Sequence, residues 1–303
     1  MPRSKPLLTC EQALRQAAAA IGGDSPRLDA ELLLARVTGW SRTSFRAWPE
    51  RELADEAAEH FAVLVSQRAN GTPVAHLLGE QGFWSLTLQV NPSTLIPRPD
   101  TECLVEAALA LPLPGAARVI DLGTGTGAIA LALASERPQW QVMACDAVAD
   151  AAELARRNAC ALGLPLEVVV SHWFADLPPG RFDLIISNPP YIRRDDHHLQ
   201  QGDVRFEPST ALVAGDDGLD DLRVIIAESP DWLQPAGWLV VEHGYDQGEA
   251  VRQLFAAAGF TAVATRRDYG GQERLTLGCW PERQAGADDA PRPISHRESS
   301  DAE

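Results

Sequence analysis

Seven apolar segments follow one another from residue 117 onward, and the stretches between most of them predict helices alternating with strands. The first five are largely continuous apolar runs, as in parallel strands that are buried on both faces. The last two follow each other closely and predict an antiparallel edge. We therefore expect an α/β fold with a doubly wound, mostly parallel seven-stranded sheet. The segments lie at 117–123, 140–146, 166–171, 182–188, 237–244, 260–268 and 274–280.

The first part of the chain has a different pattern. Thr9 and Gln12 have the spacing of a capping box, and Ser25-Pro26 is typical of a helix start. Helices are expected at 10–21, 26–38 and 52–69, and an alternating stretch at 81–90 predicts a strand or hairpin. We expect a helical domain (1–75), a connection (76–99), a sheet domain (100–281) and a disordered tail (282–303).

Composition narrows the class of protein. The chain has 303 residues, 45% of them hydrophobic, but it lacks the long apolar run of a membrane span and the features of a secretory signal. Its five cysteines are scattered and form no C-x-x-C pair, which argues against a disulfide framework or a thiolate metal site. A cytoplasmic protein without a membrane partner is expected.

The formal net charge is -16, which disfavours long-range attraction to nucleic acid. A DNA or RNA modifier usually carries a basic face. The charge therefore favours a protein partner over direct contact with nucleic acid.

A glycine-rich stretch follows the first predicted strand of the sheet and opens a helix. Glycines permit a tight turn and let a ligand approach the backbone, while the helix N-terminus offers unpaired N–H groups. Asp146 ends the next strand about 20 residues further on, where a carboxylate can accept the hydroxyls of a ribose. The spacing alone permits either NAD or S-adenosylmethionine (SAM). The loop consists of Gly123, Thr124, Gly125, Thr126 and Gly127.

The fourth apolar run ends in Asn188-Pro189-Pro190-Tyr191, because two successive prolines stop a buried strand. Ligands of doubly wound sheets bind at the carboxyl ends of the strands, so Asn188 is expected beside the glycine loop, which favours SAM. The Asn oxygen and the next backbone carbonyl can accept both hydrogens of a planar nitrogen and orient it toward a methyl donor. Tyr191 offers a π-face for a planar amide or base. The pattern predicts an N-methyltransferase.

At this point the chain resembles the SAM-dependent methyltransferases that modify a glutamine side chain of peptide-chain release factors, the PrmC or HemK family. The similarity covers roughly residues 8–280 and includes LDAELLLARVTG, LIPRPDTE, DLGTGTGAIALALASERP and SNPPYI. SNPPY alone is shared with adenine N6 and guanine N2 methyltransferases. The LIPRPDTE junction and the stretch HLQQGDVRFEP are more specific to the family.

The resemblance implies a SAM-dependent methyltransferase sheet and N5-methylation of the glutamine in a Gly-Gly-Gln tripeptide of class 1 release factors. It implies that the residues Gly123 to Gly127 line the methionine and ribose region of SAM. Asp146 would hold the ribose hydroxyls, and Trp173 would pack beside the adenine. Asn188 would sit between cofactor and substrate, and the substrate amide would be gripped by Pro189, Pro190 and Tyr191.

Two other functions stay open. A nucleic-acid N-methyltransferase acting on adenine or guanine would flip a base toward the same motif and would need a basic groove. A SAM- or NAD-binding module without catalysis is the third reading, although Asn188 and Tyr191 count against it.

Several further residues have two interpretations. His197 and His198 lack a third ligand at useful spacing, so no metal is expected. Glu242 and His243 either line the pocket or cap a strand end, and Arg98 is a candidate pocket contact. The long polar segment 193–222 is a candidate for recruiting the partner. The chain's own Gly270-Gly271-Gln272 is expected to be a hairpin turn.

Overall fold

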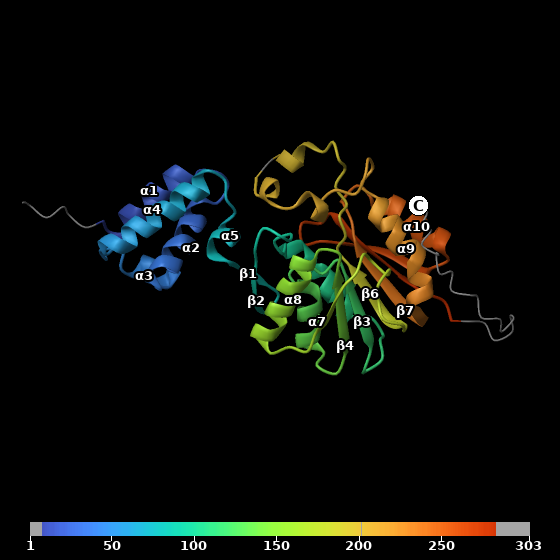
Figure 1. Cartoon of the computed structure of the whole chain (residues 1–303). Helices are drawn as coiled ribbons and strands as arrows, with labels where there is room; N and C mark the ends of the chain where they lie inside the picture. The colour runs from blue at the N-terminus through green and yellow to red at the C-terminus, as the bar shows by residue number, and fades with distance from the viewer. Residues whose placement is uncertain (1–7, 201, 283–303) are drawn as a thin grey trace, which may run out of the picture.

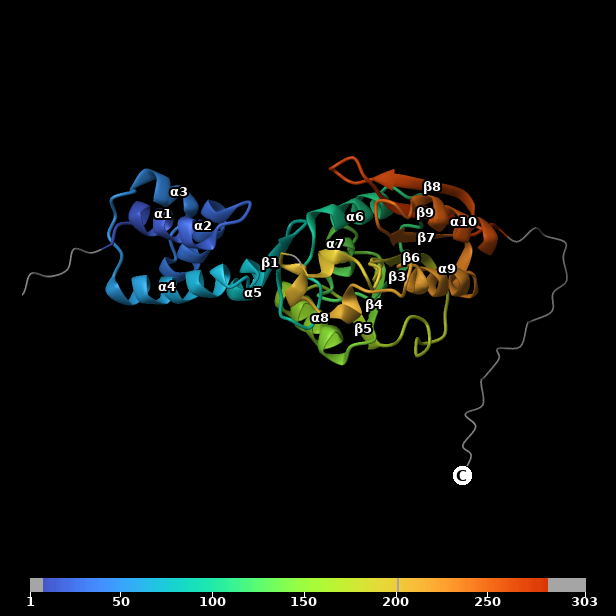
Figure 2. The ribbon, with the colours of Figure 1, turned by 90° about the horizontal axis from the view of Figure 1, so that it is seen from above.

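The computed structural model describes residues 8–200 and 202–282. A helical bundle lies to one side of a seven-stranded sheet, and a small hairpin lies between them (Figures 1 and 2). Apart from residue 282, the tail expected at 282–303 lies outside the described residues. No helix in the described ranges is long and apolar enough to cross a bilayer.

The bundle contains the three predicted helices and two short ones. The capping box of Thr9 and Gln12 is present, and Gly39 ends the second helix in the left-handed conformation. The side chain of Ser25 makes no capping hydrogen bond, although Pro26 does open that helix. The helices are α1 (Cys10–Ile21), α2 (Pro26–Thr38), α3 (Arg42–Ala47), α4 (Asp55–Ala69) and α5 (Val74–Leu78).

These helices share a hydrophobic core of their own. Leu14, Leu33, Leu34 and Phe45 are among its fully buried side chains, and within the described part of the chain the cluster contains no residue of the sheet. α4 was expected to begin near residue 52 but begins at Asp55. The short helices α3 and α5 were not predicted, because six and five residues carry too little periodicity to be recognised.

The predicted hairpin is present as β1 (Glu80–Phe83) and β2 (Leu86–Gln89), which pair antiparallel. It is attached to the sheet through Asn158, a buried residue of helix α8 (Ala149–Leu162). Asn158 Oδ1 accepts from the Gln89 N–H at 2.8 Å, and its Nδ2 donates to the Gln89 and Thr126 carbonyls at 3.0 and 2.9 Å. One amide thus joins the hairpin, α8 and the glycine loop.

The seven-stranded sheet has the order β5-β4-β3-β6-β7-β9-β8. β3 to β7 are parallel, and β8 and β9 form the antiparallel edge that the sequence predicted. The mostly parallel, doubly wound sheet is therefore confirmed. The strands are β3 (Arg118–Leu122), β4 (Gln141–Asp146), β5 (Glu167–Val170), β6 (Phe182–Ser187), β7 (Leu233–Glu242), β8 (Thr261–Arg267) and β9 (Glu273–Cys279).

Helices cover both faces of this sheet (Figure 1). Along the parallel strands, apolar residues alternate between two opposite core clusters: Val119, for example, lies in one and Ile120 in the other. This two-sided burial explains why the strands read as continuous apolar runs. One face packs against α8 together with α6 (Glu102–Leu109) and α7 (Ala128–Glu136), and the other against α9 (Asp220–Trp232) and α10 (Gly248–Ala258).

The Gly-Gly-Gln stretch lies at the turn between β8 and β9, as predicted. The Gly271 N–H donates to the Asp268 carbonyl, and the Gln272 N–H donates to Asp268 Oδ1 at 2.9 Å. Burial raises the pKa of Asp268, but backbone N–H groups and Arg274 outweigh it, so the net shift is downward. These bonds account for the stretch as a turn.

The separate helical core makes a testable prediction. Phe45 and Phe182 are each 1% exposed, one in the bundle and one in the sheet. Phe45→Ala is expected to destabilise a bundle transition by about 3–5 kcal/mol, because it leaves a cavity. Urea unfolding followed by circular dichroism should show that loss in one transition, and the matched Phe182→Ala variant should affect the other. A single transition shifted equally by both would show that the chain unfolds as one unit.

Candidate active site

The glycine loop connects β3 to α7 and passes under the ring of Trp173. A Cβ added at Gly123 would lie 3.1 Å from Trp173 Cζ3, so a larger residue would displace that ring. A Cβ at Gly127 would lie 3.0 Å from Leu131 Cδ1 and 3.3 Å from the Ala155 Cβ. Gly123 and Gly127 also have φ values of +70° and +84°. The two glycines therefore permit close approach of Trp173 on one side and of α8 on the other.

Asp146 ends β4 and holds the loop by hydrogen bonds. Its Oδ2 accepts from the Gly125 N–H and its Oδ1 from the Val148 N–H, both at 2.9 Å. Burial raises the pKa of this carboxyl, and the two N–H groups oppose the rise. Each carboxylate oxygen has a further lone pair, so the group can still accept hydroxyl donors from a ligand.

Asn188 follows β6 directly and reaches the same end of the sheet. β3 and β6 are paired so that Leu122 lies opposite Ser187, and the Ser187 hydroxyl donates to the Leu122 carbonyl at 2.7 Å. The residues that follow, Gly123 and Asn188, consequently emerge side by side. The Nδ2 of Asn188 donates to Thr101 Oγ1 at 3.2 Å.

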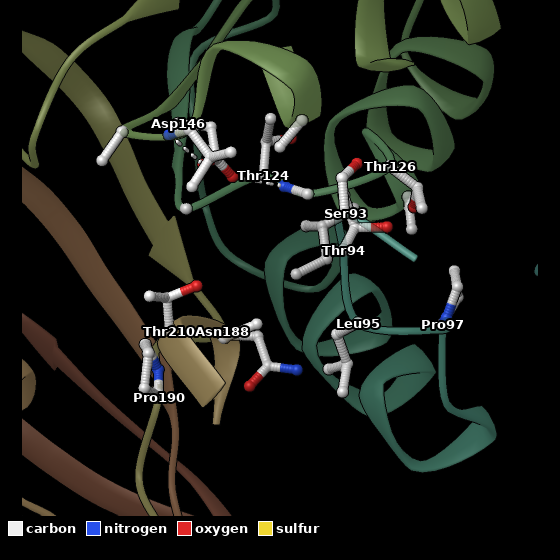
Figure 3. Close-up of a pocket in the computed structure, with 18 of the residues that line it drawn as sticks. Ser93, Thr94, Leu95, Pro97, Thr124, Thr126, Asp146, Asn188, Pro190 and Thr210 are labelled. Carbon is white, nitrogen blue, oxygen red and sulfur yellow. Dashed lines mark hydrogen bonds between the residues drawn. The ribbon is translucent and has the colours of Figure 1, made fainter. Parts of the chain in front are cut away.

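A cavity of about 420 Å³ is lined by residues 123–126 of the glycine loop, by Asp146 and by Asn188. Asp146 and Thr124 lie at one end of it, while Asn188 and Pro190 lie at the other (Figure 3). The amide group of Asn188 is directed toward the segment that carries Leu95. The predicted site residues that line this cavity are Gly123, Thr124, Gly125, Thr126, Asp146, Trp173, Asn188 and Pro190.

Three predicted site residues lie next to the cavity without lining it. Gly127 is the N-cap of α7, and Pro189 is buried. Tyr191 packs against the core cluster on one face of the sheet, and its hydroxyl donates to Glu242 Oε1 at 3.0 Å. Burial and the neighbouring Glu242 raise the pKa of the Tyr191 phenol, so the hydroxyl keeps its proton. The side chain of Tyr191 is therefore attached to the end of β7.

Several residues that line the cavity were not predicted from the sequence. Four come from the connection before the sheet, one from the short helix that follows it, one from segment 193–222 and one from the start of α9. No hydrophobic periodicity marks a proline-rich coil, so only the family-like stretch LIPRPDTE pointed to this region. The missed residues include Ser93, Thr94, Leu95, Pro97, Thr101, Thr210 and Asp221.

The candidate Arg98 does line the cavity, and it is tied to the long segment 193–222. Arg98 pairs with Glu207 at 2.6 Å, and the other oxygen of that carboxylate accepts from the Ile96 N–H at 2.9 Å. Farther along, Arg68 of α4 pairs with both Asp29 and Asp203 at 2.7 Å. The segment is therefore attached both to the cavity wall and to the helical bundle.

The other two candidate pairs do not line the cavity. Glu242 and His243 are buried at the end of β7, and the His243 ring contacts the Gly244 carbonyl and the Thr276 hydroxyl. His197 and His198 lie in an exposed turn beside Asp196, with ligand atoms within 4.8 Å of one another. The expectation of no metal stays a prediction.

Comparison with known proteins agrees with this geometry. Residues 11–79 match the family model described as PrmC N-terminal domain, and residues 100–207 match that described as Methyltransferase small domain. A methyltransferase structure from Pyrococcus furiosus shares the fold, with a TM-score of 0.51 and 17% identity over 65% of this chain and 90% of that one.

Curated relatives are far more similar in sequence. A release factor glutamine methyltransferase of Pseudomonas aeruginosa is 60% identical over 85% of this chain and 94% of its own length. That of Escherichia coli K12 is 54% identical over 88% of this chain and 96% of its own length. The chain belongs to the release factor glutamine methyltransferase family.

Proposed function

We propose that this protein transfers a methyl group from SAM to the glutamine side-chain nitrogen of class 1 release factors, at N5 of the Gly-Gly-Gln glutamine. The observation that supports it most directly is the shared cavity wall of Asn188 and the glycine loop. The names of the relatives, release factor glutamine methyltransferase, support the same acceptor.

The residues of the cavity fit SAM. The glycine loop leaves space where a Cβ would collide, and Asp146 offers acceptor capacity for ribose hydroxyls. Trp173 presents a large apolar ring to the same cavity. Thr94 Oγ1 lines it as well and is buried without a hydrogen-bond partner among the described residues. A polar ligand would satisfy that hydroxyl.

In the proposed mechanism SAM supplies an electrophilic methyl group, and the protein supplies orientation. An amide nitrogen is a weak nucleophile because its lone pair is delocalised into the carbonyl. Asn188 Oδ1 and the Pro189 carbonyl are proposed to accept its two hydrogens and aim the lone pair at the methyl group. These acceptors stabilise the nitrogen more strongly as it becomes positive, so they favour the transition state.

The prolines and Tyr191 are proposed to keep this turn rigid around the substrate amide. Pro190 lines the cavity, and the Tyr191 hydroxyl is held by Glu242. A turn that is fixed before the substrate binds needs no reorganisation during the reaction. Alignment of the two reacting atoms then provides much of the rate enhancement.

We also propose the four-part division at 1–75, 76–99, 100–281 and 282–303, with the helical bundle as a unit of its own. Segment 193–222 is proposed to receive the protein substrate, because it connects the bundle to the cavity wall. The acidic net charge supports a protein partner and a reaction without direct nucleic-acid contact. We propose a cytoplasmic site of action and no metal requirement.

The substrate can be tested with purified protein and radiolabelled SAM. One release-factor preparation carries the Gly-Gly-Gln glutamine, the second has it changed to alanine, and a DNA duplex and bulk RNA are included. Label is expected only in the first. Asn188→Ala is expected to lower kcat by about 10²–10³-fold, as for loss of one oriented polar partner of a transition state. Label in nucleic acid instead would overturn the proposed acceptor.

The role of Asp146 gives a second prediction. Asp146→Asn is expected to weaken SAM binding at least about tenfold, equivalent to about 1.4 kcal/mol, because one acceptor oxygen is lost. Isothermal titration calorimetry measures the change in Kd. Asp150→Asn is the matched control, since it removes the same charge from an exposed position at the start of α8. Equal Kd values for both variants and the wild type would contradict the assignment.

A further inference from the structure

The amide of Asn188 is held by a hydroxyl that belongs to a different part of the chain. Its Nδ2 donates to Oγ1 of Thr101, which lies at the end of the short 3-10 helix η1 (Pro99–Thr101). Thr101 is only 4% exposed and also lines the cavity. A side-chain amide has a donor end and an acceptor end, whereas a hydroxyl can both donate and accept, so the orientation of the amide depends on where the Thr101 hydroxyl directs its own proton.

Behind Thr101 lies a buried carboxylate, Glu242, which is 2% exposed at the end of β7. Its Oε1 accepts the Tyr191 hydroxyl at 3.0 Å, while its Oε2 is buried and has no hydrogen bond of normal geometry within the described residues. Burial raises the pKa of Glu242 to about 7, and the neighbouring hydroxyls of Thr101 and Tyr191 oppose the rise. The Thr101 hydroxyl therefore lies beside this carboxylate.

These contacts indicate which group the Thr101 hydroxyl donates its proton to. A hydroxyl that accepts from Asn188 has its own proton free to donate, and Glu242 in its ionised form can only accept. The orphaned Oε2 of Glu242 is the acceptor that needs such a donor. If the Thr101 proton points to Glu242, the hydroxyl offers Asn188 only a lone pair. Asn188 must then present Nδ2 to Thr101 and turn Oδ1 the other way.

We propose that Glu242 is a positioning residue of the methyl-transfer site, acting through Thr101 to orient the Asn188 amide and through Tyr191 to hold the adjoining turn. The proposal rests on the proposed function, because it concerns the acceptor for the substrate nitrogen. With Oδ1 free, Asn188 accepts a hydrogen from the substrate amide. With the amide reversed, two NH₂ groups would face each other and the nitrogen would lose its orienting partner.

A purely structural role for the cluster makes a different prediction. If Glu242 and Thr101 only fill the space beneath the turn, shape alone matters, and an isosteric change is tolerated. If the hydroxyl orients Asn188, then loss of the hydroxyl is costly even when the shape is kept. Threonine offers this contrast, because valine retains its shape and serine retains its hydroxyl.

The experiment compares Thr101→Val with Thr101→Ser in the full chain, using radiolabelled SAM and the glutamine-bearing release factor. Thr101→Val is expected to lower kcat by about 10- to 100-fold, the range that misorientation of a reacting group produces. KM for the release factor and Kd for SAM should change by less than about twofold. Thr101→Ser should stay within about threefold of the wild-type kcat. Circular dichroism and thermal unfolding verify that each variant is folded.

Glu242→Gln and the double variant Thr101→Val/Glu242→Gln provide the second measurement. If Glu242 acts through Thr101, both changes remove the same interaction with Asn188. The kcat of the double variant should then be only slightly lower than that of the worse single variant. Independent effects that multiply would overturn the proposed path, and so would equal kcat values for Thr101→Val and Thr101→Ser.

The outcomes also separate this proposal from the proposed function. Label in nucleic acid rather than in the release factor would overturn the acceptor, and the same variants would then be compared on that acceptor. A wild-type protein that labels the release factor, with Thr101→Val equally active, overturns the positioning role alone. A wild-type protein that transfers label to no acceptor would overturn both proposals.

Discussion

The parallel pairing of β3 with β6 is the constraint on which the candidate site depends. Leu122 lies opposite Ser187, so β3 and β6 end at the same position along the sheet. The Ser187 hydroxyl adds a bond to the Leu122 carbonyl at that last pair. A shift of one residue in this register would turn Ser187 and its neighbours to the opposite faces of the sheet. The distance between the glycine loop and Asn188 is thus set by backbone hydrogen bonds rather than by flexible side chains.

The remaining parts of the cavity are attached to this fixed edge by polar contacts from distant segments. Asn158 joins the hairpin to the glycine loop, and Glu207 joins segment 193–222 to the connection through Arg98 and the Ile96 N–H. The Glu207 side chain is fully buried, so removal of its partner would leave an uncompensated buried carboxylate. The two Glu207 contacts join residues that lie more than 100 positions apart in the chain.

The sheet and the two ends of the cavity could be predicted because their signals are local. Continuous apolar runs identify buried parallel strands, and the glycines, Asp146 and Asn188 follow directly after such runs. Thr94, Leu95 and Thr101 could not be placed in the same way, because a proline-rich coil has no period that tells which way its side chains point. The direction of the Tyr191 side chain could not be predicted from the sequence either. Its attachment to Glu242 depends on the pairing of β6 with β7, which only the assembled sheet reveals.

Three carboxylates near the cavity accept hydrogen bonds from hydroxyl or N–H groups of neighbouring residues. Asp121 accepts from the Thr124 hydroxyl at 2.6 Å and from the Ala130 N–H at 3.3 Å, Asp146 accepts from loop N–H groups, and Glu242 accepts from Tyr191. Burial raises the pKa of Asp121 to about 7 and that of Glu242 to about 7, yet neither side chain lines the cavity. Groups placed behind the wall can orient a loop or an amide but cannot take a proton directly from a substrate. Methylation of an amide nitrogen is compatible with such a design, because the protonated product is a strong acid and loses its proton without a dedicated base.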